Sequence, residues 1–270
     1  MAGIVFSDVD GTLVGSDHHA IPQSATPIQC IAAHVPICLV SARSPEGLYP
    51  IQRDLGFEGP LACYSGAYVL DDKGNELFSC TIPTELAIKA KRIAKEEFPA
   101  ITVGTYGFHN WIADDTDDPR IKNEEYLVQT RARACSDIAS VFGDKGVHKL
   151  LLMGEQETIA QVEQTMRKEF PMLNVVRSSA ILCEVMSYEA DKGNAVRLLC
   201  DHYGVDPTDA IAFGDGPNDI DMLRAVGTSF AMANAEDSVK TVATHVLPWS
   251  NVECGVAQQL TRSFPAYFAS

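Results

Sequence analysis

Two aspartates stand two positions apart in the motif Asp8-Val9-Asp10-Gly11-Thr12-Leu13, directly after a short apolar run. A carboxylate with no neighbouring base can attack phosphorus and form a covalent intermediate. Asp8 suits that role. If the chain turns at Gly11, Asp10 reaches the leaving group as a general acid and then acts as the base on water. The pair therefore predicts phosphoryl-transfer chemistry.

Further groups in the chain supply the charges that this chemistry needs. A carboxylate repels a phosphate dianion, and Asp8 and Asp215 offer the hard oxygen ligands that suit Mg²⁺, which cancels that repulsion. Lys192 adds a point charge and Ser41 a hydroxyl donor for the transferring oxygens. Ser41 begins the motif Ser41-Ala42-Arg43, and Asp215 lies in the motif Gly214-Asp215-Gly216-Pro217-Asn218-Asp219. Lys192 stands at the start of a predicted helix.

Continuous apolar runs precede three of these motifs, a pattern typical of parallel strands buried on both faces. We expect strands at 3–7, 35–40, 210–213 and 229–232, and helices at about 24–33, 45–55, 192–203 and 218–226. This alternation predicts a doubly wound α/β core. In such a sheet, functional groups gather outside the carboxyl ends of the strands, where these motifs fall.

The middle of the chain has a different pattern. We expect helices at 84–98 and 155–170 and strands at 101–107, 110–113, 148–153, 175–177 and 181–186. This is an α+β arrangement inside an α/β chain. We therefore expect an inserted domain at 83–186, with a core domain built from 1–82 and 187–270.

Taken together, the four motifs resemble those of the haloacid dehalogenase (HAD) superfamily, in order and spacing, over nearly the whole chain. The insertion resembles the type-2 cap of the Cof-like sugar-phosphatase branch, subfamily IIB. Outside the insertion, the stretches 64–67 and 252–257 also resemble that branch. The resemblance implies a Rossmann-like parallel-sheet core with an inserted α+β cap. It also implies that Asp8 is the nucleophile and Asp10 the acid/base, with Mg²⁺ bound by Asp8, the backbone carbonyl of Asp10, and Asp215.

The resemblance extends to the groups around the phosphate. It implies that Ser41 and Lys192 hold the phosphoryl group with help from Asn218, and that Asp219 serves the metal site. Whether Asp219 binds the metal or supports it from behind stays open, and a third possibility is that it caps the following helix. For Arg43, a substrate contact and a structural salt bridge are equally favoured.

Residues outside the four motifs are further candidates for substrate contact. His18 and His19 lie just after the first motif, where solvated surface histidines are favoured over substrate contacts. In the inserted domain, Tyr106 and Trp111 have stacking potential, although packing is the default for Trp111.

The expected activity is a Mg²⁺-dependent phosphomonoester hydrolase acting on a small phosphorylated metabolite, foremost a sugar phosphate, through an aspartyl-phosphate. One alternative is a phosphosugar mutase, in which the phosphoenzyme transfers its phosphate back to a sugar. Another is a non-catalytic regulator that binds sugar phosphates, against which the presence of Asp8, Asp10 and Lys192 argues. A dehalogenase would lack the acid at position 10, and an ion-pumping ATPase would carry threonine there.

Composition narrows the partners. Among 270 residues, 21 Lys and Arg stand against 36 Asp and Glu, a net charge of −15. Such a charge repels nucleic acid and anionic membranes, so we expect neither as a partner. The eight cysteines include no CxxC pair and lie mostly beside apolar residues, which favours buried thiols over disulfides. With no secretory leader and no long apolar stretch, we expect a cytoplasmic protein.

Overall fold

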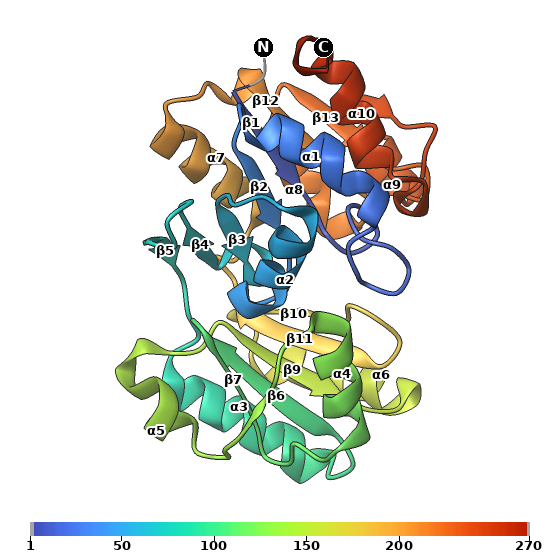
Figure 1. Ribbon diagram of the computed structural model, residues 1–270. Helices are drawn as coiled ribbons and strands as arrows, with labels where there is room; N and C mark the ends of the chain where they lie inside the picture. Colours follow the sequence, from blue (N-terminus) through green and yellow to red (C-terminus); the bar gives the residue numbers. More distant parts are fainter. Residues whose placement is uncertain (1–2, 269–270) are drawn as a thin grey trace. The chain divides into compact units, whose positions relative to one another are not determined.

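The computed structural model describes residues 3–268 and divides into two compact units (Figure 1). The first unit comprises Met1–Arg43, Gly47–Phe78 and Asp191–Ser270. The second comprises Ser44–Glu46 and Ser79–Ala190. Each unit is built around its own sheet.

The first unit contains an eight-stranded sheet in the order β14-β13-β12-β1-β2-β3-β4-β5. Its strands are β1 (Ile4–Ser7), β2 (Ile37–Val40), β3 (Leu61–Cys63), β4 (Tyr68–Leu70), β5 (Glu76–Ser79), β12 (Ala210–Gly214), β13 (Thr228–Ala231) and β14 (His245–Val246). The pairs from β14 to β3 are parallel, whereas β4 runs antiparallel to β3. Strands β1, β2 and β12 are buried along their whole length, because helices cover both faces of the sheet.

The direction of winding reverses beside β1. The chain passes from β1 to β2 and β3 on one side, and from β12 to β13 and β14 on the other. Because parallel crossovers are right-handed, opposite directions of travel place the connecting helices on opposite faces of the sheet. The helices of this unit are α1 (Ala25–Ala32), α2 (Pro45–Leu55), α7 (Lys192–Tyr203), α8 (Ile220–Arg224), α9 (Asp237–Lys240) and α10 (Gly255–Ser263). The predicted doubly wound α/β core is confirmed.

The second unit is an α+β fold on a six-stranded sheet in the order β10-β11-β9-β6-β7-β8. Its elements are α3 (Thr84–Glu97), β6 (Thr102–Gly107), β7 (Asn110–Ala113), α4 (Pro119–Val128), β8 (Arg133–Ala134), α5 (Ile138–Phe142), β9 (Lys149–Met153), α6 (Gln156–Glu169), β10 (Leu173–Val176) and β11 (Leu182–Ser187). Apolar side chains from one face of this sheet pack with those of α3 and α6 into one core. Val103, Ile112 and Leu150 belong to it, together with Ala90 and Val162 of the helices.

The predicted elements differ from the observed ones at short strands and at helices α4 and α10, where no helix was predicted. Helices α2 and α7 begin and end where the sequence predicts. Strands β3 and β4 were not predicted, because three residues each are too few to show a periodicity. Helix α4 was also missed, although Pro119 is its first residue and the Asp118 side chain accepts a hydrogen bond from the Arg120 amide as its cap.

All eight cysteines are free thiols, and five of them are buried. The expectation of reduced, largely buried cysteines therefore agrees with the structure. Within residues 3–268, no helix combines the length and the apolarity needed to cross a membrane.

Candidate active site

The carboxyl ends of adjacent parallel strands gather the chemical groups of the first unit. Strand β1 lies between β12 and β2, with Ser7 in register with Phe213 on one side and with Leu39 on the other. Asp8 therefore follows β1 at the same edge of the sheet where Ser41 follows β2 and Asp215 follows β12. This is also the edge beside the reversal of winding, where open α/β sheets bind their ligands.

A buried lysine holds two carboxylates together at this edge. The Lys192 Nζ donates to Asp8 Oδ1 at 2.6 Å and to Asp219 Oδ1 at 2.6 Å. The Lys192 side chain is 1% exposed and opens α7, whose N-terminus Asp191 caps by accepting a hydrogen bond from the Asn194 amide. The helix cap and the two ion pairs together fix the Lys192 ammonium beside Asp8, the candidate nucleophile.

The protonation states of Asp8 and Lys192 follow from their burial and from their ion pair. Burial, reinforced by the negative charge of Asp219, raises the pKa of Asp8 well above its ordinary value, although Lys192 opposes the shift. Burial also acts to lower the pKa of Lys192, but its two carboxylate partners outweigh it and raise that pKa. Lys192 therefore stays an ammonium, and a further cation would favour the ionised form of Asp8.

Asp215 lies against the turn that follows Asp10. The Thr12 hydroxyl donates to Asp215 Oδ1 at 2.7 Å. Gly11 has φ +82°, and a Cβ there would lie 2.3 Å from Asp215 Oδ2, so only glycine permits this close approach. Burial raises the pKa of Asp215 to about 6, with Thr12 opposing the shift and Asp219 adding to it.

Three carboxylates form a group that fits a divalent cation. Asp8, Asp215 and Asp219 each offer an oxygen within 4.8 Å of the others. The Lys192 ammonium bonds to Asp8 and Asp219 and attracts Asp215, but its single charge is outnumbered by three carboxylates. This excess of negative charge adds to burial in raising the pKa values of Asp8 and Asp215. An all-oxygen donor set with excess negative charge suits Mg²⁺.

Within that group, the Asp219 carboxylate already accepts hydrogen bonds from other groups of the protein. Its Oδ1 accepts from Lys192, and its Oδ2 accepts from the amides of Asp215 at 2.9 Å and Gly216 at 3.0 Å. Its side chain makes no capping hydrogen bond to α8, so the alternative that it caps that helix is wrong. Its bonds point back to the loop after β12, and Gly214 at the end of that strand leaves the space, since a Cβ there would lie 2.6 Å from the Asp219 Cβ.

The Asp10 carboxylate is gripped by an arginine and a histidine. Arg43 Nε donates to Oδ2 at 2.9 Å and Nη2 to Oδ1 at 2.6 Å, while the His18 Nδ1 lies 2.7 Å from Oδ1. Burial acts to raise the pKa of Asp10, but the hydrogen bonds from His18 and Arg43 outweigh it and hold that pKa well below its usual range. Asp10 is an ionised carboxylate in this arrangement.

These contacts resolve two interpretations that the sequence left open. Arg43, with a side chain 5% exposed, forms the salt bridge rather than an open substrate contact. His18 is partly exposed, as a surface histidine would be, but its ring bonds to Asp10, which the sequence analysis did not predict. A histidine eight residues from its partner in a loop has no spacing pattern that could have revealed the pair.

The two remaining candidates lie at the rim of this cluster. Ser41 is 2% exposed, and its hydroxyl accepts the Arg43 amide at 3.2 Å. Asn218 is exposed in the 3₁₀ turn Pro217–Asp219, and among the described residues no hydrogen bond joins its side chain to the carboxylates. The structure thus brings Asp8, Asp10, Lys192, Asp215 and Asp219 together, with Ser41 beside them and Asn218 at the edge.

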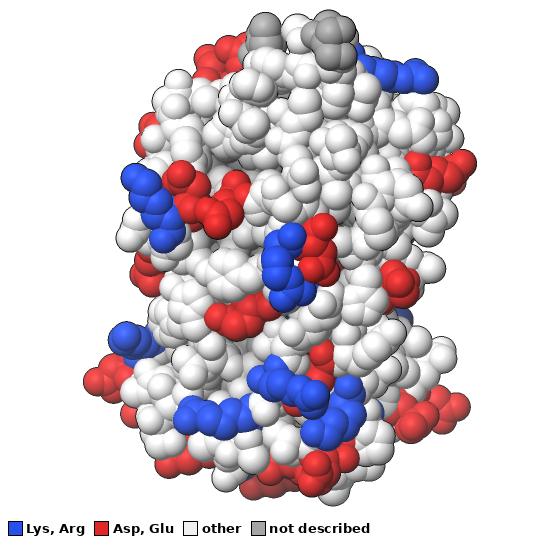
Figure 2. Space-filling view, in the orientation of Figure 1, with Lys and Arg blue, Asp and Glu red and all other residues white. Residues whose placement is uncertain are grey.

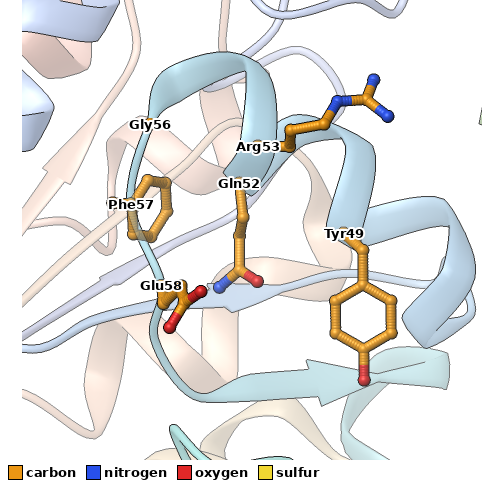
Figure 3. A pocket seen from close by; sticks show the side chains of 6 residues that line it. All are labelled: Tyr49, Gln52, Arg53, Gly56, Phe57 and Glu58. Atoms are coloured by element: carbon orange, nitrogen blue, oxygen red, sulfur yellow. The ribbon is translucent and has the colours of Figure 1, made fainter.

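A hollow in the surface of the first unit lies apart from this cluster. Figure 3 shows its lining along and after α2: Tyr49, Gln52, Arg53, Gly56, Phe57 and Glu58. It contains none of the carboxylates described above. The group of carboxylates around Lys192, and not this hollow, is therefore the candidate active site.

Comparison with known proteins agrees with this geometry. Residues 5–260 match the family of haloacid dehalogenase-like hydrolases, and the chain belongs to that family. A protein of Haemophilus influenzae named "Putative phosphatase" is 34% identical over 262 residues, which cover 97% of this chain and 98% of that protein.

Solved structures show the same fold. A haloacid dehalogenase-like hydrolase from Bacteroides thetaiotaomicron has a TM-score of 0.88 at 24% identity, covering 98% of this chain and 100% of the other. A sugar phosphatase of HAD subclass IIB has a TM-score of 0.77 at 23% identity, covering 97% and 98%. The predicted membership of the Cof-like HAD phosphatases, and with it the prediction of a phosphatase enzyme, is confirmed.

Proposed function

We propose that this phosphatase is a Mg²⁺-dependent phosphomonoester hydrolase that works through an aspartyl-phosphate on Asp8. One observation carries the proposal: the buried Asp8 carboxylate lies 2.6 Å from the Lys192 ammonium and within 4.8 Å of two further carboxylates. A nucleophile toward phosphate needs such a cationic partner and a place for a metal, because the reacting groups are both anionic.

For the metal, we propose Asp8, Asp215 and the backbone carbonyl of Asp10 as ligands. Asp219 supports the site from behind, because its oxygens already accept bonds from Lys192 and two backbone amides. When bound, Mg²⁺ neutralises the carboxylates and the substrate phosphate and polarises the phosphoryl group.

The chain's own groups perform two displacements. An Asp8 oxygen forms a bond to phosphorus while the bond between phosphorus and the leaving oxygen breaks, and Asp10 gives that oxygen a proton. Water then attacks the phosphorus of the aspartyl-phosphate, Asp10 takes the proton from the water, and phosphate leaves with Asp8 regenerated. Lys192, Ser41 and Asn218 hold the phosphoryl oxygens during both steps.

The ionised Asp10 described above suits the second displacement directly. A carboxylate held by Arg43 and His18 can accept the proton of the attacking water. To carry a proton to a leaving group, Asp10 has to lose part of this grip, because both neighbours favour its charged form. The contacts of Asp10 with Arg43 and His18 therefore support its role as the proton acceptor in the hydrolytic step.

For the substrate, we propose a small phosphorylated metabolite, and foremost a sugar phosphate. The solved relative titled as a subclass IIB sugar phosphatase supports this class. Residues 83–186, within the second unit, serve as the cap that gives specificity. There the rings of Tyr106 and Trp111 stack on each other at 4.9 Å with the Lys149 ammonium 5.0 Å over Tyr106, and both rings are buried, so these two residues pack and do not carry the proposal of a sugar.

Charge argues against polyanionic partners. The net charge is −15, and on the face shown in Figure 2 basic and acidic side chains lie side by side without forming one broad basic tract. Nucleic acid and anionic membranes need such a tract to release their counterions. The proposed partner is therefore a small phosphorylated metabolite.

Phosphate release tests this function. Purified protein is assayed with a panel of sugar phosphates and other phosphomonoesters, with Mg²⁺ and with a chelator, beside Asp8→Asn and the control Asp54→Asn, an exposed carboxylate on α2. We expect turnover that requires Mg²⁺, is lost in Asp8→Asn and is retained in Asp54→Asn. Turnover that persists in Asp8→Asn, or in chelator, would overturn the proposal.

A further inference from the structure

Two asparagines outside the recognised motifs hold the turn that follows Asp10. The Asn234 Nδ2 donates to the carbonyl of Gly11 at 2.8 Å, and the Asn251 Nδ2 donates to the carbonyl of Val14 at 2.8 Å. The Asn251 amide donates to Asn234 Oδ1 at 3.0 Å. This third bond orients the Asn234 side chain, so that its nitrogen faces Gly11.

The turn that they hold borders the proposed metal site. The peptide carbonyl of Asp10 is joined directly to Gly11, and the Gly11 backbone lies so close to Asp215 that a Cβ would strike it. Glycine at φ +82° gives this backbone the widest freedom to rotate. The amides of Thr12, Leu13 and Val14 close the turn onto the Val9 carbonyl. The two asparagines add bonds to the carbonyls of the turn itself, those of Gly11 and Val14.

The asparagines reach the turn from distant parts of the chain. Asn234 lies in the loop after β13, and Asn251 opens the 3₁₀ turn Asn251–Glu253 after β14. The first loop is tied to Asp215, because the Glu236 amide donates to the Asp215 carbonyl at 3.1 Å. It is tied to the second by the Ala233 amide, which donates to the Trp249 carbonyl at 3.0 Å. One hydrogen-bonded frame therefore holds the segments of both proposed metal ligands, Asp215 and the Asp10 carbonyl.

We propose that Asn234 and Asn251 are positioning residues that set the Asp10 carbonyl for Mg²⁺ before the metal binds. The inference rests on the proposed function, since it assumes that this carbonyl is a ligand. Partners that orient metal ligands commonly contribute about 10- to 100-fold to metal affinity. Because Asn234 is exposed, we expect its contribution at the lower end of that range.

The test measures Mg²⁺ binding rather than turnover. Calorimetric titration of the metal-free, full-length protein compares wild type with Asn234→Ala, Asn251→Ala and the control Asn123→Ala, an exposed asparagine on α4. We expect Asn234→Ala to weaken Mg²⁺ binding about tenfold and Asn251→Ala roughly threefold, the latter because it leaves the bond to Gly11 intact. Asn123→Ala should bind as wild type does.

Two further readouts separate positioning from loss of fold. The melting temperature of the metal-free variants should match that of wild type, and kcat at saturating Mg²⁺ should recover to within roughly twofold, since excess metal compensates for weaker binding. If Asn234→Ala fails to fold, Asn251→Ala carries the test with its smaller shift.

The outcomes distinguish this inference from the proposed function. If wild type binds Mg²⁺ and both asparagine variants bind it equally well, the positioning role is wrong and the proposed function stands. A lower kcat that excess Mg²⁺ does not restore, at unchanged Mg²⁺ affinity, likewise overturns it. If wild type itself binds no Mg²⁺, the proposed function fails, and the inference fails with it.

Discussion

The Arg43 guanidinium holds the Asp10 carboxylate with two hydrogen bonds, Nε to Oδ2 at 2.9 Å and Nη2 to Oδ1 at 2.6 Å. Arg43 also donates to the carbonyl of His18 at 3.2 Å, and the His18 ring reaches back to the same carboxylate. The three residues thus orient one another. A planar fork of this kind fixes both the position and the charge of the carboxylate.

Replacing Arg43 should therefore impair the chemical step more than substrate binding. In Arg43→Lys a single ammonium cannot reproduce two parallel bonds, so Asp10 loses its fixed orientation. We expect kcat to fall roughly 10- to 100-fold with little change in KM. Steady-state kinetics on the best substrate of the panel measure both.

The matched control is Arg53→Lys, which alters an exposed arginine–aspartate pair on α2. It should leave both constants unchanged. If Arg43→Lys instead raises KM at unchanged kcat, Arg43 binds substrate, and its contact with Asp10 does not matter for catalysis.

Removing the charge of Lys192 should destabilise the protein in a pH-dependent way. Lys192→Met leaves Asp8 and Asp219 buried without their cation, and breaking such a pair from one side costs about 3–5 kcal/mol of unfolding free energy. Burial already raises the pKa of Asp8, and loss of the Lys192 charge, which opposes that shift, raises it further. The folded variant therefore holds a proton on Asp8 that the unfolded chain has released, so its stability falls as the pH rises from the ordinary pKa of an aspartate toward the raised one.

Urea unfolding at pH 5 and pH 8 in metal-free buffer measures this effect. We expect the deficit of Lys192→Met relative to wild type to be larger at pH 8. The control Lys168→Met removes an exposed lysine of α6 and should cost little at either pH. Equal stability of Lys192→Met and wild type at pH 8 would show that the ammonium does not offset the carboxylates.

The sequence located most of this site because one rule of sheet geometry gathers it. Asp8, Ser41 and Asp215 each follow a continuous apolar run, and the carboxyl ends of parallel strands meet at one edge. The start of α7 at Lys192 was equally visible, since a capping aspartate precedes a helical pattern that ends before Gly204. The site residues that were predicted are thus those that follow a buried strand or begin a regular helix.

What the sequence could not predict depends on the paths of loops. Whether Arg43 meets substrate or Asp10 is decided by where the segment carrying His18 runs, and no periodicity encodes that path. Asn234 and Asn251 are single polar residues in loops, and their shared target is more than 220 positions away. Asp219 was ambiguous because an aspartate before a helix can bond forward or, as here, backward.

The buried histidine of the second unit predicts a separate pH effect on stability. His148 is fully buried, with Nδ1 accepting the Phe108 amide at 3.0 Å and Nε2 lying 3.0 Å from the Ser79 hydroxyl. Burial lowers the pKa of His148 to about 3 from an ordinary value of 6.5. Between these values the unfolded chain binds a proton that the folded chain does not, so stability falls as the pH drops below 6.5.

Unfolding free energies of wild type and His148→Gln from pH 7 to pH 4 check this. We expect wild type to lose about 1.4 kcal/mol more per pH unit than the variant, because glutamine does not titrate. The variant should be the less stable protein at pH 7, with the gap narrowing in acid. If the unfolding free energies of the two proteins instead run parallel with pH, His148 takes up its proton in the folded state at the same pH as in the unfolded chain.

The covalent intermediate on Asp8 is the central claim, and mass spectrometry of acid-quenched enzyme tests it most directly. Wild type, Asp10→Asn and Asp8→Asn are mixed with Mg²⁺ and an aryl phosphate, whose leaving group needs no proton, and are then quenched and digested. We expect a phosphoryl adduct on Asp8 that accumulates in Asp10→Asn, which lacks the base for water, and that is absent from Asp8→Asn. Turnover by wild type with no adduct in Asp10→Asn, or an adduct at another residue, would contradict the account.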